Sequence, residues 1–327
     1  MNLSLDCIPC FVRHALDMAR MASTDEAIHR QVLREVLLEA AGWDMSLPAP
    51  VLSQRVQRRL QALTGIADPY RAAKQRFNEL ALELLPELRA KVEMAADPLE
   101  AAVRVVIAGN VIDVGLDDNL REEDIKRSLS QSLAGPFAGD LDSFREAISG
   151  AGEILYLADN TGEIVFDRLL VERLRAPRIT VAVRGAAVLN DATLADARVA
   201  GLDRIAQVID NGSGAPGTIL GECSAAFRER FESADIIIAK GQGNFETLAD
   251  GPGNIFFLLK IKCAVVAAHT GLEIGTQALI QNRGLLEAHP ESPAAQSYFS
   301  LADRLHEQED LWSGAAAAAL ASREALQ

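Results

Sequence analysis

The chain begins with a long stretch of helical pattern. Between residues 10 and 95 apolar side chains recur every three or four positions, as Phe11, Ala15 and Met18 do, and this spacing is typical of amphipathic helices. Glycines and prolines interrupt the pattern and divide it into about four predicted helices. These breakers are Gly42, Pro48, Pro50, Gly65, Pro69 and Pro86. We therefore predict an N-terminal all-helical domain over residues 1–97.

After residue 150 short apolar runs rich in Ile and Val alternate with segments of helical pattern. The runs are Ile154–Ala158, Ile179–Val183, Ile205–Ile209, Ile236–Ala239 and Ala264–Ala268. Runs that are apolar on both faces are typical of parallel strands covered by helices on both sides. The pattern predicts a doubly wound α/β sandwich with a mainly parallel sheet over residues 98–280. Within it, Ala101–Asp113 is predicted to be a buried helix interrupted at Gly109-Asn110, and residues 281–327 are predicted to form a helical tail.

The composition excludes several classes of protein. The chain has 32 basic and 46 acidic residues and a formal net charge of −14. Its Lys and Arg residues never form a run of five or six, which argues against a surface for nucleic acid or anionic membranes. No apolar stretch reaches the roughly 18 residues of a membrane-spanning helix, and the start lacks the pattern of a secretory signal. We expect a cytoplasmic protein whose partners are small molecules; its oligomeric state stays open.

Polar residues follow each of the apolar runs. In open parallel sheets ligands bind outside the carboxyl ends of the strands, so these residues are predicted to converge. They are Asp159-Asn160-Thr161-Gly162-Glu163, Arg184-Gly185 with Asn190-Asp191, Asp210-Asn211-Gly212, Lys240-Gly241-Gln242-Gly243-Asn244, and His269. Carboxylate and amide oxygens suit Mg²⁺ or Mn²⁺, while Arg and Lys supply the positive charge that a phosphate needs. The set predicts a site for a metal ion and a phosphate.

The predicted roles follow from the residue types. Asp159, Asn160 and Asp191 carry the oxygen ligands for a metal ion. The helix that starts after Asn160 points free N–H groups at an anion, and the glycines near Lys240 let the backbone approach one closely. The alternative is that the Asp-Asn pairs are ordinary turn or N-cap residues and that Lys240 is a solvated lysine on a flexible loop.

One glycine-rich segment resembles a dinucleotide-binding motif. Residues 212–217 match GxGxxG between a predicted strand and a predicted helix. The segment follows the third strand instead of the first, contains Pro216, and is not followed by an acidic residue at the end of the next strand. A tight loop is the favoured interpretation, and a loop that closes over substrate is the next.

Six motifs occur in one order along the chain. They are CIPC at residue 7, AGNVIDVG at 108, LADNTGEIVFD at 157, VRGAAVLNDAT at 183, AKGQGNFETL at 239 and KCAVVA at 262. This order closely resembles the damage-control phosphatases, long classed as domain of unknown function 89, and the N-terminal CxxC resembles their prokaryotic branch. The resemblance covers residues 7 to about 275.

The resemblance implies a fold, an activity and a set of site residues. It implies an N-terminal helical domain on a Rossmann-like α/β/α domain, and phosphatase activity on small phosphorylated metabolites with Mn²⁺, Co²⁺, Ni²⁺ or Mg²⁺. Asp159, Asn160 and Asp191 would be the metal ligands, and Asp159, Lys240 and Arg184 the catalytic groups. The substrate-binding residues would be Asn110, Asp113, Glu163, Asn190, Gly241, Gly243 and Asn244.

Two mechanisms and two functions are compatible with these residues. A metal-activated water can attack the phosphorus while Lys240 and Arg184 neutralise charge, or Asp159 can attack it directly. Thr161 leaves no second carboxylate two positions after Asp159, which disfavours the direct attack. The alternative function is a non-catalytic sensor of phosphometabolites or nucleotides. Few aromatic residues near the motifs, mainly Phe166 and Phe245, slightly favour a sugar phosphate or a phosphopantetheine-like chain over a nucleotide.

The cysteines and histidines suggest less. Cys7 and Cys10 have a spacing that lets both thiolates reach one metal ion or each other, and Cys263 would join them if the N-terminus folds back onto the sheet. The alternative is that the three are small side chains packed in the core, as Cys223 is predicted to be. No HExxH motif is present, and His269 is expected to be structural.

Overall fold

The computed structural model describes residues 1–110 and 122–282. Twelve helices and seven strands lie within these ranges. The helices are α1 Cys7–Ala22, α2 Glu26–Ala40, α3 Ala49–Thr64, α4 Arg71–Met94, α5 Pro98–Ala108, α6 Glu122–Ala134, α7 Leu141–Gly150, α8 Glu163–Val171, α9 Leu194–Ala200, α10 Ala225–Ser233, α11 Gly241–Leu248 and α12 Ala264–Thr270. The strands are β1 Phe137–Gly139, β2 Glu153–Leu157, β3 Arg178–Val183, β4 Gln207–Asp210, β5 Ile236–Lys240, β6 Ile255–Lys260 and β7 Gln277–Gln281.

The strands form one sheet in the order β1-β7-β6-β5-β2-β3-β4. All neighbouring pairs are parallel except β6 and β7. The chain winds outward from β2 through β3 to β4, and then from β5 through β6 to β7 on the other side. The winding therefore reverses between β2 and β5, and in sheets of this kind the crevice at such a reversal binds the ligand.

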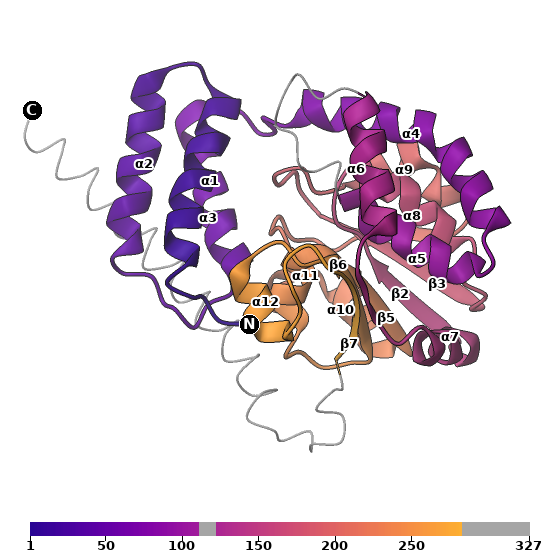
Figure 1. Ribbon diagram of the computed structural model, residues 1–327. Helices are drawn as coiled ribbons and strands as arrows, with labels where there is room; N and C mark the ends of the chain where they lie inside the picture. The colour runs from indigo at the N-terminus through magenta and orange to yellow at the C-terminus, as the bar shows by residue number, and fades with distance from the viewer. Residues whose placement is uncertain (111–121, 283–327) are drawn as a thin grey trace, which may run out of the picture.

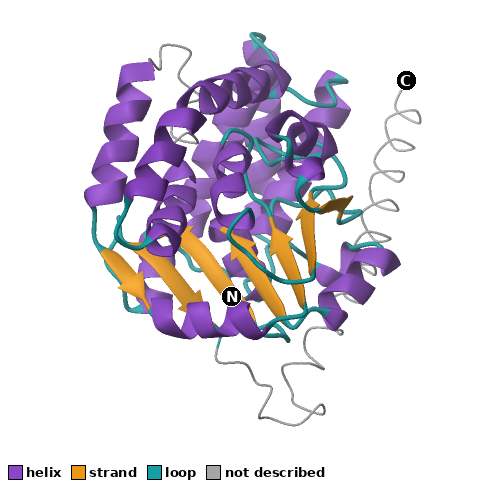
Figure 2. Cartoon of the chain, turned by 90° about the vertical axis from the view of Figure 1, so that its right-hand side faces the viewer, coloured by secondary structure: helices purple, strands orange, loops and turns teal. Residues whose placement is uncertain are grey.

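Helices cover both faces of the sheet, as predicted (Figures 1 and 2). Alternate strand residues point to opposite faces. Ile154 and Tyr156 join a core with α4, α5, α7 and α8, whereas Leu155 and Leu157 join a second core with α10 and α11. The α/β sandwich with a mainly parallel sheet is confirmed.

The N-terminal helices divide into two packing groups. Helices α1, α2 and α3 share a core of their own around Ala15, Met18 and Val36, and in Figure 1 they stand beside the sheet layers. The side chains of α4 pack instead into the large core on the sheet. Packing therefore groups α4 with the α/β part, although the sequence analysis placed the domain boundary after residue 97.

Several sequence predictions need correction. Residues 264–268 form helix α12, not a strand, so His269 does not follow a strand. The strands β1, β6 and β7 were missed, and Pro86 lies inside α4 instead of ending a helix. A short apolar run fits either a strand or a helix, because only a few residues are present to show the period. The aromatic and branched side chains of residues 255–260 were the signal for β6.

The predictions for residues 101–113 and for the C-terminal tail fall partly within the described residues. The predicted helix of residues 101–113 is confirmed up to Ala108, where α5 ends. Asp113 and all of the predicted tail beyond residue 282 lie outside the described residues. Gln281 belongs to β7. No described helix is both long and apolar enough to span a membrane.

Candidate active site

The site forms where β2, β3 and β5 end. Asp159 and Asn160 follow β2, Arg184 follows β3, and Lys240 is the last residue of β5. Four of the five predicted runs are strands, and three of these, β2, β3 and β5, end together where the winding reverses. All four side chains are buried, with 8% or less of each residue exposed.

The Asp159 carboxyl group is held by two amides. Its Oδ2 accepts hydrogen bonds from Asn110 Nδ2 at 3.1 Å and from Asn160 Nδ2 at 2.9 Å. The same two amide nitrogens donate to Glu163 Oε2, at 2.8 and 3.2 Å. Asn110 and Asn160 therefore bring two carboxyl groups into one cluster. Burial and the nearby charges of Glu163 and Asp191 raise the pKa of Asp159 well above its ordinary value.

Arg184 approaches Asp159 from β3. Its Nε donates to Asp191 Oδ2 at 2.6 Å, and its Nη1 lies 3.3 Å from Asn244 Oδ1 and 3.4 Å from the Thr218 hydroxyl. Its Nη2 lies 3.9 Å from Asp159 Oδ1 and has no hydrogen-bond partner among the described residues. A buried guanidinium donor without a partner carries a desolvation cost, which an acceptor placed beside it would remove.

Lys240 lies behind the carboxyl cluster. Its Nζ donates to Glu163 Oε1 at 2.5 Å, to Asp167 Oδ1 at 2.8 Å and to the Val106 carbonyl at 2.8 Å. These three acceptors use the three ammonium protons. The predicted alternative of a solvated lysine is therefore wrong, because Lys240 is fully buried.

Asp167 was missed as a site residue. It lies four positions after Glu163 on α8, so both carboxyl groups face the same side of that helix and reach Lys240. Burial raises the pKa of Asp167 to about 6 although Lys240 opposes the shift. Burial by itself would lower the pKa of Lys240, but Asp167 and Glu163 raise it. The signal in the sequence was the spacing of the two acids within GEIVFD.

The glycines of the β5–α11 turn have different neighbours. Gly241 has φ 78°, and a Cβ built on it would lie 1.8 Å from Asp159 Oδ2. A Cβ on Gly243 would lie 2.3 Å from the Pro216 carbonyl oxygen. Gly241 thus lets the start of α11 approach Asp159, whereas Gly243 lets the glycine-rich loop of residues 212–217 pack on α11. This loop forms a close backbone contact, in line with the tight-loop interpretation.

Two other predicted residues act through their neighbours. The Asn244 side chain holds Arg184 and donates to the Lys240 carbonyl at 2.7 Å. The Asn190 carbonyl accepts from the N–H and the hydroxyl of Thr161, both at 2.9 Å. Asn160 and Asp191 form an isolated β-bridge. The loops after β2 and β3 are therefore joined to each other.

The described residues include no group of three His, Cys, Asp or Glu side chains arranged to hold a metal ion. The predicted ligand set contains Asn160, so it is not a group of this type. Cys7 and Cys10 lie near Cys263 and Glu246, whose charges add to the effect of burial in raising the thiol pKa values. The N-terminus lies against α11, where the Met1 amino group donates to the Glu246 carbonyl at 2.9 Å. Cys223 is buried, as predicted.

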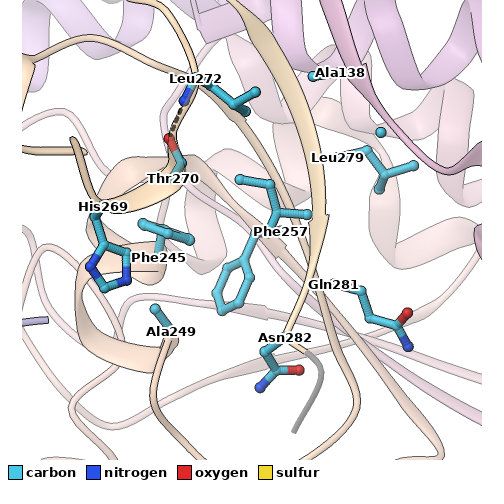
Figure 3. A pocket seen from close by; sticks show the side chains of 12 residues that line it. Ala138, Phe245, Ala249, Phe257, His269, Thr270, Leu272, Leu279, Gln281 and Asn282 are labelled. Atoms are coloured by element: carbon cyan, nitrogen blue, oxygen red, sulfur yellow. Dashed lines mark hydrogen bonds between the residues drawn. The ribbon is translucent and has the colours of Figure 1, made fainter. Parts of the chain in front are cut away.

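A cavity of about 460 Å³ lies apart from this site. Phe245, Phe257, Leu279 and His269 are among the residues that line it, and none of the site residues above does (Figure 3). His269 packs edge-on against Phe245, with ring centroids 5.7 Å apart. His269 therefore belongs to this cavity and not to the cluster around Asp159.

Comparison with known proteins assigns the chain to a family. Residues 3–278 match the damage-control phosphatase ARMT1-like domain. The chain belongs to the damage-control phosphatase family. A protein of Archaeoglobus fulgidus named damage-control phosphatase is 37% identical over 282 residues, which are 84% of this chain and 97% of the relative. A damage-control phosphatase of Pyrococcus horikoshii is 33% identical over 86% of this chain and 99% of the relative.

Solved structures agree with this assignment. A crystal structure of a DUF89 family protein from Pyrococcus horikoshii superposes with a TM-score of 0.79 and 31% sequence identity. The match covers 86% of this chain and all of that protein. The resemblance stated from the six motifs is thus confirmed for the family and for the fold.

Proposed function

We propose that this damage-control phosphatase hydrolyses phosphomonoesters of small metabolites with the help of a divalent cation. The observation that carries the proposal is Arg184 Nη2, a buried donor without a partner among the described residues, 3.9 Å from Asp159 Oδ1. A phosphoryl oxygen is the acceptor that a guanidinium group binds well. Beside it, Asp159 supplies a carboxylate for a cation or for attack.

The residues around Asp159 fit a divalent cation. Four buried carboxyl groups, on Asp159, Glu163, Asp167 and Asp191, face two buried cations, Arg184 and Lys240. Asn110 Oδ1 is buried and has no hydrogen-bond partner among the described residues. Asp159, Asn160 and Asp191 would hold the cation, which can be Mn²⁺, Co²⁺, Ni²⁺ or Mg²⁺, since oxygen atoms suit these ions. When bound, it supplies Lewis-acid polarisation of the phosphoryl group and a water of lowered pKa.

The protein side chains divide the remaining work. Arg184 would donate from Nη2 to a phosphoryl oxygen while its Nε stays on Asp191. The start of α11, kept close to Asp159 by Gly241, would offer backbone N–H groups to the same anion. Asn110 and Asn160 fix the orientation of Asp159 by holding its Oδ2. The chemistry therefore depends on positioning and on charge.

The role proposed for Lys240 is indirect. Because its three protons are on Glu163, Asp167 and Val106, it stabilises the carboxyl cluster and does not itself reach a phosphate. This replaces the sequence-based expectation that Lys240 neutralises the phosphoryl oxygens. Arg184 is the buried cation of this site with a donor, Nη2, that has no partner among the described residues.

The aromatic residues near the motifs support a substrate without a nucleobase. Phe166 and Phe245, the aromatic residues nearest to the motifs, are 0% and 3% exposed and pack in the two cores of the sheet. Phe166 is fully covered, and Phe245 is nearly so and borders the separate cavity, so neither ring offers a base a surface to stack on beside Asp159. Sugar phosphates and phosphopantetheine-like chains are the first candidates in a substrate screen, followed by nucleotides.

The test is phosphate release by purified protein from p-nitrophenyl phosphate and from a panel of phosphorylated metabolites, with Mn²⁺, Co²⁺, Ni²⁺ and Mg²⁺ in turn. We expect the Asp159→Asn variant to lose activity by a factor on the order of 100 or more, as removal of a metal ligand or a nucleophile does. The matched control is Asp210→Asn. Asp210 ends β4, and its one side-chain hydrogen bond among the described residues is the local one from the Gly212 N–H. No turnover by the wild-type protein with any of these ions would contradict the proposal.

A trapping experiment separates the two mechanisms. Mass spectrometry of protein quenched in acid during turnover would show a phosphoryl group on Asp159 if this side chain attacks phosphorus. We expect no such adduct, because a water is the nucleophile in the favoured mechanism.

A further inference from the structure

Two buried amide side chains from the N-terminal helices reach the loops of the candidate site. Gln57 on α3 and Asn78 on α4 are each 3% exposed. The Asn78 Oδ1 accepts from the Gly162 N–H at 2.8 Å, at the start of α8. Gln57 reaches the loop between β3 and α9. Both loops carry the residues that surround Asp159 and Asp191.

Gln57 uses both ends of its amide on one loop. Its Nε2 donates to the Ala187 carbonyl at 3.0 Å, and its Oε1 accepts from the Leu189 N–H at 2.8 Å. A residue between these two, Val188, is 1% exposed. The pair of bonds fixes the positions of two backbone groups that are two residues apart.

The loop is strained at the residue that Gln57 holds. Leu189 has φ 45°, and it is the one residue other than glycine with a positive φ in the described part of the chain. A branched side chain in this left-handed region costs on the order of 1 kcal/mol or more, so the surrounding contacts must impose it. The Leu189 side chain packs against the core of α1–α3, so both its backbone and its side chain are held by the helical part.

The strained turn leads directly to the site. The next residue, Asn190, accepts two hydrogen bonds from Thr161 through its carbonyl oxygen. Asp191 then pairs with Arg184 and forms the β-bridge with Asn160. The direction of the chain at Leu189 therefore decides where Asn190 and Asp191 lie relative to the loop after β2.

We propose that Gln57 is a positioning residue of the phosphatase site, which holds the left-handed turn at Leu189 so that Asp191 faces Asp159. The inference rests on the proposed function for its catalytic consequence, and on the geometry alone for its structural one. It gives the separate helical core of α1–α3 a role in the reaction, although none of its side chains contacts Asp159 in the interactions described above.

Gln54 is a matched control on the same helix. It lies one turn before Gln57, is 2% exposed, and also donates from its Nε2 to the α/β part, to Glu222 Oε2 at 2.8 Å. Glu222 lies in the short 3-10 helix Leu220–Glu222 and accepts from the Ser213 hydroxyl at 3.2 Å, so Gln54 bonds to a different loop from the one that contains Leu189. Gln54→Met and Gln57→Met both remove a buried amide from α3 and replace it with a side chain of similar length.

The experiment compares these variants by hydrogen exchange and by turnover. For Gln57→Met we expect the Leu189 and Thr161 amides to exchange at least about tenfold faster and kcat/KM for phosphate release to fall at least about tenfold, as loss of buried hydrogen bonds allows. Gln54→Met should leave both amides and the activity within about twofold of the wild type. Gln57→Glu keeps an acceptor for the Leu189 N–H, so we expect its exchange and activity to lie between those of Gln57→Met and the wild type.

The outcomes separate this inference from the proposed function. Unchanged exchange at Leu189 or Thr161 in Gln57→Met would overturn the positioning role, and so would faster exchange with undiminished turnover. If the wild-type protein releases no phosphate, the proposed function fails, and the exchange of Thr161 alone decides whether Gln57 positions the loops. If Gln57→Met does not fold, the comparison of Gln57→Glu with the control gives the same decision.

Discussion

At the scale of single residues, Asp159 lies in a site where buried acidic side chains outnumber buried basic ones. Its carboxyl group shares two amide donors with Glu163 and lies near Asp191. The Arg184 Nη2, which has no hydrogen-bond partner in the described part of the chain, lies 3.9 Å from it. Close approach of backbone and side chains makes this crowding possible. Two residues give testable consequences of this close packing and burial: Gly241 beside Asp159, and Glu246 near the N-terminus.

We predict that Gly241→Ala abolishes most of the activity. The added Cβ would lie 1.8 Å from Asp159 Oδ2, so the start of α11 or the Asp159 side chain must move. The control is Gly271→Ala, because Gly271 has a similar φ of 71° with nothing within 4 Å of its added Cβ. In both variants the left-handed backbone of the new alanine lowers the stability of the fold by about 1 kcal/mol. Only Gly241→Ala should also lose turnover. Equal activity in the two variants would contradict the close approach.

Glu246 gives a prediction about pH. Burial raises its pKa to about 7 from an ordinary value of 4.5, while Gln242 donates to it. Between these pH values the folded state holds the proton and the unfolded state has lost it. The free energy of unfolding therefore falls as pH rises from 4.5 to 7, by up to about 3 kcal/mol from this group. Urea unfolding should show that Glu246→Gln lacks this part of the decline and that the exposed Glu232→Gln keeps it.

At the scale of elements, β5, α5 and α8 meet at one ammonium group. Lys240 ends β5, Val106 belongs to α5, and Glu163 and Asp167 lie on α8. Tyr156 on β2 donates to Asp167 Oδ1 at 2.7 Å and joins the same network. The sheet and the helices of one face are thus connected by a buried polar network that its members satisfy jointly, except for Asp167 Oδ2.

We predict that Lys240→Met destabilises the fold by roughly 3–5 kcal/mol. The change leaves Glu163 and Asp167 buried without their cation. Without Lys240, which lowers it, the pKa of Asp167 lies above its value of about 6 in the wild type. The destabilisation should therefore shrink as pH falls toward 6, because protonation in the variant removes the uncompensated charge of Asp167. Lys91→Met is the control, since Lys91 and its partner Glu87 are both 54% exposed. Chemical unfolding of both variants measures the difference, and an effect of Lys240→Met as small as that of Lys91→Met would contradict the network.

The three thiols near the N-terminus come from distant parts of the sequence. Cys7 and Cys10 on α1 lie near Cys263, the residue just before α12, as expected from the sequence if the N-terminus folds back. A metal or redox site formed by these three thiols stays a prediction, with packing as the alternative.

At the scale of the whole molecule, a net charge of −14 must coexist with the binding of a phosphate dianion. The buried groups of the site add to this difficulty, since four buried carboxyl groups there are paired with two buried cations, Arg184 and Lys240. A bound divalent cation would balance the excess locally and create a positive site on an acidic protein. The proposed cytoplasmic location and the absence of nucleic-acid partners stay predictions.

We predict that removal of divalent cations stops turnover and leaves the fold intact. Dialysis against a chelator should lower phosphate release to background, and added Mn²⁺ or Mg²⁺ should restore it. Circular dichroism should stay unchanged, because the two cores of the sheet and the core of α1–α3 consist of apolar side chains. Full activity after exhaustive chelation would contradict the metal dependence.

The hydrophobic pattern predicted the class of the fold and the strand ends that meet at the candidate site. Apolar runs at residues 154, 179 and 236 predicted the central strands, and the polar residues after them predicted Asp159, Arg184 and Lys240 as neighbours. These predictions succeed because the carboxyl ends of parallel strands meet at one edge. The order of six motifs was enough to indicate the family, which the comparisons confirmed.

Only the packing of the elements shows which polar side chains already have hydrogen-bond partners. Lys240 looked like a phosphate ligand from its position, but only packing shows that its protons are on Glu163 and Asp167. The contacts of Gln57 and Asn78 join segments more than 80 residues apart and follow no local pattern. Local sequence sets the period and the turns, whereas hydrogen bonds between distant segments depend on how the elements pack.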